Sequence, residues 1–428
     1  MTEEFLHYIW RCNLFYPLNS GTCEIEVMNT GEPNPDSGPD FFNAMVRLDG
    51  TLLAGNVEMH INSSDWYRHG HHTNRAYDNV ILQLVLNQDA VARRTNGEIV
   101  PTATIRFDRR LYENYRELIE SQYWIPCEPF ISIADINTVS KWLDIMAIRR
   151  LEQKVRHMEE VLCYNQNDWQ ESFYQLLARS FGFRLNGWAF EMLARSIPYR
   201  LILKHRNNLF QLEAMLFGQA GLINGEEADD YSRDLNREHR FLLRKYSLKP
   251  LEKHIWKFLR LRPANFPTVR IAQLASFLHR NTGMFATILE TGEPGKIELL
   301  FRVSASGYWD NHYVFGRPSS KKVKSLGRFA INSIIINTVV PLIYFYGRYR
   351  KIPGLTGRAL DFLKKLPAEV NSITGKWNSI GICARNAYTT QALLQQKNEL
   401  CAFKKCLNCA IGNYIIKNPI AGDNIYPA

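Results

Sequence analysis

The chain has 428 residues, of which 46% are hydrophobic and 22% charged; these ordinary proportions exclude extensive disorder and leave room for two or three domains. Its 52 lysine and arginine residues exceed its 42 aspartate and glutamate residues, and the net charge of +10 favours a polyanionic partner such as nucleic acid, although a basic solvated surface explains the same balance. The acidic first residues do not resemble a signal peptide and the cysteines are unevenly spaced, so we expect a cytoplasmic protein without a disulfide framework.

Hydrophobic periodicity predicts a short helix over residues 3–11, followed by a run of strands. The predicted strands cover residues 23–28, 42–48, 51–61, 79–86 and 102–107. An Asp49-Gly50 turn separates the second of these strands from the third. These elements predict a small mixed α/β domain over residues 1–110.

From about residue 111 onward the apolar residues recur at spacings of three and four, which is typical of helices. The predicted helices cover residues 143–161, 169–181, 188–204, 209–217 and 237–261. A short strand at 297–303 and an irregular stretch at 304–320 interrupt them. The fold class is therefore predicted to be α+β, with a large mainly α-helical domain over residues 111–428.

The longest apolar stretch, residues 329–346, contains asparagines, a serine, a threonine and Pro341. It is too polar for a membrane span and predicts a buried helix with a kink near the proline. We therefore expect no membrane partner.

Three polar residues of the predicted sheet, Asp40, Glu58 and His60, are candidates for chemistry. Glu58 and His60 lie two apart on one strand and therefore share a face. A two-residue loop at Asp49-Gly50 would pair Asp40 with the residue between them, on the wrong face. Asp40 joins the pair if the hairpin has a bulge or a longer loop, or if Asp40 lies just beyond the ladder.

An aspartate and a glutamate on neighbouring strands form an oxygen-rich site suited to Mg²⁺ or Mn²⁺ and to phosphodiester hydrolysis. Pro39-Asp40 and Glu58-Met59-His60 resemble the motif of the PD-(D/E)XK nuclease superfamily. This resemblance implies a restriction-endonuclease-like core in the order helix, three strands, helix, strand. It also implies catalytic roles for Asp40, Glu58 and His60, with Asp40 and Glu58 as metal ligands and Glu3 or Glu4 as a further acid.

His60 departs from the superfamily, which usually has a lysine at this position. A histidine there could be the general base, a third metal ligand or a protonated electrophile. It also fits a second hypothesis, in which the chain is a non-catalytic nucleic-acid-binding or scaffold protein that has lost nuclease activity.

Three more histidines, His69, His71 and His72, follow on a predicted loop. Their crowding near Glu58 suggests further metal or phosphate contacts, whereas a solvated polar turn explains each of them singly. If they bound Zn²⁺ together with Glu58 or His60, the chain would be another kind of metallohydrolase or a metal-binding barrel.

Over nearly its full length the chain also resembles a bacterial family of unknown function. The segments that carry this resemblance are residues 34–41, 55–72, 79–86 and 260–275 and the C-terminal cysteine motif. The resemblance implies no activity.

Two basic segments of the helical part are candidates for nucleic-acid binding. Their residues are Arg260, Arg262 and Arg270 in the first segment and Lys321, Lys322 and Lys324 in the second. Helix capping explains the arginines equally well, and a solvated loop explains the lysines.

The C-terminal cysteines have metal-ligand spacing, Cys401-x4-Cys406-x2-Cys409, and Cys383 could be a fourth ligand of Zn²⁺ or of an iron-sulfur cluster. Some nucleases of the resembled superfamily carry such a cluster. The alternative is one continuous helix over residues 389–411, on which the cysteines would pack against a neighbour without metal.

Overall fold

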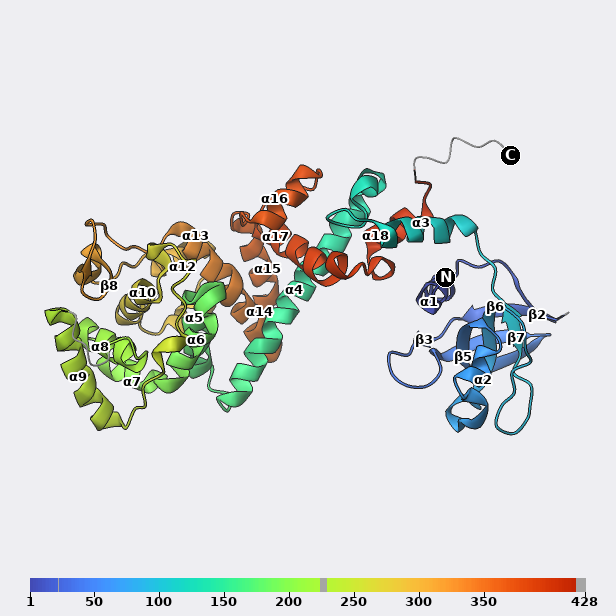
Figure 1. The fold of residues 1–428 in the computed structure, drawn as a ribbon, viewed down its shortest axis with the longest axis horizontal. Coiled ribbons are helices and arrows are strands. Elements are labelled where there is room, and N and C mark those ends of the chain that lie inside the picture. Colours follow the sequence, from blue (N-terminus) through green and yellow to red (C-terminus); the bar gives the residue numbers. More distant parts are fainter. Residues whose placement is uncertain (22, 224–228, 421–428) are drawn as a thin grey trace. The chain divides into compact units, whose positions relative to one another are not determined.

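The computed structural model describes residues 1–21, 23–223 and 229–420, and the chain divides into two compact units (Figure 1). Unit 1 comprises Met1–Trp142 and Lys397–Ala428, and unit 2 comprises Leu143–Gln396. A mixed sheet near the N-terminus precedes a large, mainly helical region, so the predicted α+β class is confirmed. A division after residue 110 into domains that fold independently stays a prediction.

Unit 1 is built on a seven-stranded sheet, and its strands are β1 (Leu18–Ser20), β2 (Cys23–Asn29), β3 (Glu32–Pro33), β4 (Phe41–Leu48), β5 (Thr51–Asn62), β6 (Val80–Asn87) and β7 (Thr102–Thr104). Its helices are α1 (Glu3–Arg11), α2 (Asp65–Arg68), α3 (Arg109–Glu120) and α18 (Ala410–Lys417), with short 3-10 turns that include η1 (His71–Thr73), η2 (Arg75–Tyr77) and η3 (Glu128–Ile133). The predicted first helix and strands are confirmed, although the last strand is shorter than predicted.

The strand order in the sheet is β1-β2-β4-β5-β6-β7, and β3 pairs with β4. Pairs up to β5 are antiparallel, whereas β5, β6 and β7 run parallel. Parallel strands need a crossover, and the crossover between β5 and β6 contains α2, η1 and η2. Because β1 and β7 contact each other, the sheet curls into a near-barrel.

A bulge interrupts the hairpin of β4 and β5. The two strands are joined by a two-residue turn, so their register begins as a tight hairpin. Between the pairs Ala44–Gly55 and Phe41–Val57, however, β4 holds one residue more than β5. Asn43 takes up this extra residue with a φ of 55°, a left-handed conformation that asparagine tolerates better than most residues.

Unit 2 is helical, and its helices are α5 (Trp169–Phe181), α6 (Phe183–Ser196), α7 (Tyr199–His205), α8 (Leu209–Gln219), α9 (Asp230–Tyr246), α10 (Pro267–Arg280), α11 (Met284–Glu290), α12 (Pro294–Leu300), α13 (Arg328–Ile334), α14 (Val340–Tyr349), α15 (Leu355–Lys365), α16 (Ser372–Ser379) and α17 (Ala387–Gln395). The long helix α4 (Ile136–Tyr164) begins in unit 1 and continues into unit 2. Its single small sheet pairs β8 (His312–Val314) with β9 (Arg317–Pro318) within the described residues.

Three predictions for unit 2 are wrong in detail. The helix predicted over 188–204 is broken between α6 and α7, because Pro198 has no N–H to continue the helical ladder. The helix predicted over 237–261 ends at Tyr246, where Ser247 turns left-handed. The strand predicted over 297–303 is instead largely the helix α12, which begins at Pro294, a favourable first residue for a helix.

The apolar stretch Arg328–Tyr349 is long and apolar enough to cross a membrane, and 78% of its most apolar window is buried inside the protein. It is not a regular α-helix, because a π-helical turn, η7 (Ile335–Val339), joins α13 to α14 just before Pro341. The stretch therefore forms a core segment of unit 2 with an irregularity close to the predicted kink.

Candidate metal centre

The bulge in β4 places Asp40 beside Glu58. Asp40 lies immediately before β4 and its backbone N–H donates to Glu58 Oε2 at 3.1 Å. Its own Oδ2 accepts from the backbone N–H of Met59 at 2.9 Å. Asp40 therefore lies just beyond the ladder, separated from the turn at Asp49-Gly50 by the bulge at Asn43. Both features were among the arrangements predicted to bring the two acids together, and the two carboxyl groups are neighbours.

Glu58 also approaches two imidazoles. Its Oε1 lies 3.5 Å from His60 Nε2, on the same face of β5, and 3.1 Å from His71 Nε2. Both nitrogens are buried, and neither has a hydrogen bond to any described residue. Buried nitrogens without a hydrogen bond are rare, and a metal ion is one group that would satisfy them.

His60, His69 and His71 form a triad in which one ligand atom from each residue lies within 4.8 Å of the others. His60 comes from β5, whereas the other two come from the turn after α2. Gly70 separates them with a φ of 75°, a left-handed conformation that lets the chain reverse and return His71 toward Glu58. We call these three residues the histidine triad.

The turn that carries the triad is anchored on both sides. The indole N–H of Trp66 donates to the carbonyl of Arg93 at 2.9 Å, and Ser64 binds the carboxylate of Asp89 through its backbone and hydroxyl. The ring of Tyr77 stacks on His71 with centroids 3.8 Å apart. These contacts hold the imidazoles in place before any ligand binds.

The surroundings of Glu58 disfavour a negative charge on its carboxyl group. Burial, and then the negative charge of Asp40, raise the pKa of Glu58 well above its usual range. Burial, and then the neighbouring His71 and His69, lower the pKa of His60 to about 4. The site thus combines a buried carboxyl group with a neutral imidazole, the form in which histidine binds metals.

His7 on α1 is a further member that the sequence did not indicate. Its Nε2 lies 3.2 Å from Asp40 Oδ2. Burial lowers the pKa of His7, but the close contact with the Asp40 carboxylate and the charges of Asp40, Glu3 and Glu58 outweigh burial, so the pKa is raised. Glu3 and Glu4, which the nuclease resemblance implies as a further acid, lie on the same helix, and Glu3 is close enough to raise the pKa of Glu58 by its charge.

Gln83 on β6 contacts the other nitrogen of His60. Its Nε2 lies 3.2 Å from His60 Nδ1 and 3.3 Å from the carbonyl of Ser63, and its Oε1 accepts from the Thr102 hydroxyl. This arrangement puts the proton of His60 on Nε2. A metal on His60 Nε2 requires the His60 proton on Nδ1. A flip of the Gln83 amide would present the Gln83 oxygen to that proton, and the Gln83 nitrogen would then donate to Thr102.

The residues predicted to bind nucleic acid fall into two groups. Arg260, Arg262, Lys321 and Lys322 are exposed. Arg270 and Lys324 are buried. Arg270 donates to Gln273 and Asn265, and Lys324 donates to two backbone carbonyls, so both already have structural partners. A pocket of about 300 Å³ is lined by Arg270, Lys322 and Lys324, and binding of nucleic acid there stays a prediction.

The predicted set of four cysteines is divided in the structure. Cys401, Cys406 and Cys409 are buried in unit 1, whereas Cys383 is exposed in unit 2. Another buried cysteine of unit 1, Cys127, was not part of the prediction.

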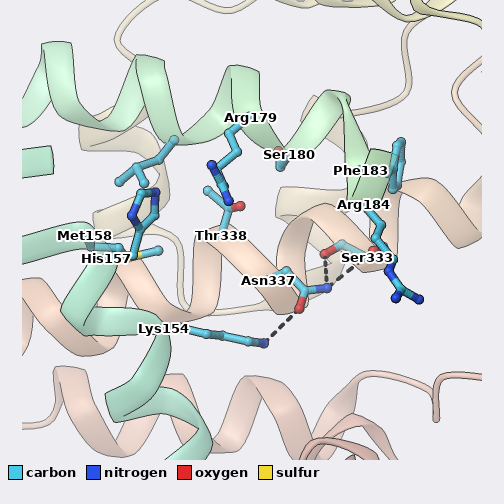
Figure 2. A pocket seen from close by; sticks show the side chains of 11 residues that line it. Lys154, His157, Met158, Arg179, Ser180, Phe183, Arg184, Ser333, Asn337 and Thr338 are labelled. Carbon is cyan, nitrogen blue, oxygen red and sulfur yellow. Dashed lines mark hydrogen bonds between the residues drawn. The ribbon is translucent and has the colours of Figure 1, made fainter. Parts of the chain in front are cut away.

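A cavity of about 520 Å³ lies in unit 2, between α4, α5, α6 and the π-helical turn (Figure 2). Four of its lining residues are basic or can become so: Lys154, His157, Arg179 and Arg184. Lys154 Nζ donates to Asn337 Oδ1 at 2.8 Å and to Gln391, so its amino group already has hydrogen-bond partners, and burial lowers its pKa to about 7. The lining contains no carboxylate, which makes this cavity unsuitable for a metal cation.

Comparison with known protein families matches residues 3–372 to the family described as "Protein of unknown function (DUF2851)". The predicted resemblance to a family without an assigned function is therefore confirmed over these residues, which do not include the C-terminal cysteine motif. The comparison gives no evidence for the resemblance to the PD-(D/E)XK nucleases. No curated protein and no solved structure matches the chain.

Proposed function

The chain belongs to this family, DUF2851, whose description names no activity, and we propose that its N-terminal site is that of a metal-dependent hydrolase acting on phosphodiester bonds of nucleic acid. The observation that carries the proposal is the histidine triad, whose ligand atoms lie within 4.8 Å of one another beside the buried carboxyl group of Glu58.

The donor set fits Zn²⁺ best. Three imidazoles are typical ligands of catalytic zinc, which keeps a fourth position for water or substrate. Mg²⁺ and Mn²⁺, which the acidic pair alone would favour, prefer oxygen ligands. Asp40 and Glu58 then act beside the ion rather than as its main ligands.

Each residue near the triad has a role in such a hydrolysis. A divalent ion bound there would lower the pKa of water and polarise a phosphoryl oxygen. A cation beside Glu58 would offset the burial that raises its pKa, and the Glu58 carboxylate then accepts the proton of the attacking water, whose oxygen bonds to phosphorus as the bond from phosphorus to the leaving oxygen breaks. His7, whose proton is stabilised by Asp40, donates a proton to the leaving oxygen.

Two features support nucleic acid as the substrate class. With β1 and β3 left out, the order α1, β2, β4, β5, α2, β6 follows the helix, three strands, helix, strand of the resembled nucleases, and Asp40, immediately before β4, lies beside Glu58 on β5. The net charge of +10 favours a polyanionic substrate. His60 replaces the usual lysine, and its role as a zinc ligand accounts for that difference.

The test is a cleavage assay with Zn²⁺, Mn²⁺ or Mg²⁺ on duplex, single-stranded and branched DNA and RNA. The wild type should cleave at least one substrate with Zn²⁺, and Glu58→Gln and His71→Gln should each lose about 100-fold or more in rate. His72→Gln is the matched control, because His72 lies on the same turn outside the triad and should keep the wild-type rate.

A non-catalytic protein that binds nucleic acid is the competing hypothesis. It would bind polyanions with a steep salt dependence and would bind equally well after Glu58→Gln. If no metal and no substrate gives cleavage while binding is retained, the hydrolase proposal is wrong.

A further inference from the structure

Unit 1 holds a second group of metal-ligating side chains, distinct from the histidine triad. We call it the thiol cluster, and its members are Cys127, Cys401, Cys406 and Cys409. All four are buried, with relative exposures of 4 to 8%. Cys127 immediately precedes η3 and Cys409 immediately precedes α18, and these two elements contact each other. Burial raises the pKa of the Cys127 thiol, and the other three thiols raise it further.

The segment with three of these cysteines is not the continuous helix that the sequence allowed as an alternative. After α17 the chain forms a π-helical turn (Gln396–Leu400) and two 3-10 turns (Cys401–Phe403 and Cys406–Asn408) before α18 begins at Ala410. Lys404, between the two 3-10 turns, is left-handed with a φ of 51°. Along this broken path all three thiols are buried.

Close packing holds this segment in shape. A side chain on Gly412 would bring its Cβ within 2.5 Å of the carbonyl oxygen of Cys406, so α18 lies directly against the second 3-10 turn. Burial also raises the pKa of the Cys406 thiol to about 12, and the neighbouring thiols contribute in the same direction.

The segment that carries Cys127 is fixed against the same turns. The ammonium groups of Lys397 and Lys404 donate to the carbonyls of Trp124 and Ile119. Asn114 donates to the carbonyls of Ile416 and Asn418, both at 3.1 Å. Contacts of η3 with α18 and of α3 with the turn at 406–408 complete this packing.

We propose that the thiol cluster is a structural Zn²⁺ site that ties the C-terminal segment to the chain around Cys127. Four thiolates in a closed tetrahedral set are typical of structural zinc, and the Cys-x2-Cys pair at 406 and 409 has the spacing of one half of such a site. Cysteine binds zinc as the thiolate, so binding releases the thiol protons. No disulfide is formed among the cysteines of the described chain. The proposed set of ligands leaves out Cys383, which is exposed in unit 2.

The proposal is independent of hydrolase activity, and its experiment separates the thiol cluster from the histidine triad. Full-length protein is stripped of metal, loaded with Co²⁺ and examined by absorption spectroscopy. Thiolate ligands give a strong near-ultraviolet sulfur-to-cobalt absorption, which imidazole ligands do not. The wild type and His71→Gln should both show this band. Cys406→Ser and Cys127→Ser should lose or strongly reduce it, and Cys383→Ser should keep it.

Metal analysis of the wild type as purified gives a second result that does not depend on any variant folding. It should contain about one zinc that survives in His71→Gln. Absence of both that zinc and the cobalt band in the wild type would overturn the proposal, as would a band that is unchanged in Cys406→Ser. Iron with acid-labile sulfide would support a four-thiolate site and overturn the choice of zinc.

Discussion

Replacing Glu58 with glutamine should stabilise the metal-free protein and should at the same time reduce the stabilisation that added zinc gives. In the metal-free chain the Glu58 carboxyl group is 5% exposed and lies beside Asp40, so its negative charge is unfavourable. Glutamine keeps the shape of the side chain and an oxygen for the N–H of Asp40. We expect the metal-free variant to be more stable than the wild type by about 1–3 kcal/mol, the usual range for relieving a buried polar group.

In the zinc-loaded chain the same change should weaken zinc binding and so reduce the stabilisation that zinc gives. Loss of a carboxylate next to metal-binding imidazoles typically lowers affinity by about 10- to 100-fold. Zinc at one hundred times its Kd stabilises the folded wild type by about 2.7 kcal/mol, and a 100-fold weaker Kd leaves only about 0.4 kcal/mol at the same concentration.

Thermal or urea unfolding with and without added zinc measures both effects, and Cys406→Ser in both proteins removes the contribution of the thiol cluster. A metal-free Glu58→Gln protein that is less stable than the wild type, with an unchanged response to zinc, would refute the reasoning.

Three further predictions concern the frame around the site and the core of unit 2. Burial lowers the pKa of His239 from 6.5 to about 4, so between these pH values the unfolded chain binds a proton that the folded chain does not. The free energy of unfolding should therefore fall by up to ~3 kcal/mol as the pH drops from 7 to 4. His239→Met should reduce that fall, as measured by urea unfolding. Gly218→Ala should destabilise the protein by about 1–3 kcal/mol, because the new Cβ would lie 2.0 Å from the His239 ring, whereas Gly357→Ala, with nothing within 4 Å, should be neutral or stabilising in the same measurement. Asn43→Val should weaken zinc binding in a calorimetric titration, because a β-branched residue is strained at the left-handed bulge that positions Asp40. Asn43→Gly should keep the zinc affinity of the wild type. Equal zinc affinity in the two variants would contradict this role of the bulge.

Local patterns were sufficient to predict much of unit 1. Alternation along β5 placed Glu58 and His60 on one face, and the need for a bulge or a position beyond the ladder followed from counting residues around the turn. The position of the bulge at Asn43 could not be predicted, because several residues of β4 could have supplied the extra position.

The remaining members of the site depend on contacts between distant segments. His7, Gln83 and Cys127 have no local pattern that distinguishes them from ordinary core residues, and only the packing of α1, β6 and η3 brings them to their partners. For His69 and His71 the sequence left a solvated turn and a metal site open. Gly70 and the anchoring of Trp66 favour an ordered turn, because together they return both imidazoles to β5.

The most direct test of the central claim is anomalous diffraction at the zinc absorption edge from a crystal of the zinc-loaded protein. The proposal predicts an anomalous peak about 2.0–2.1 Å from one nitrogen of each imidazole of His60, His69 and His71, with Glu58 beside it. A crystal grown in excess zinc that shows no peak among these three imidazoles would contradict the proposed metal centre.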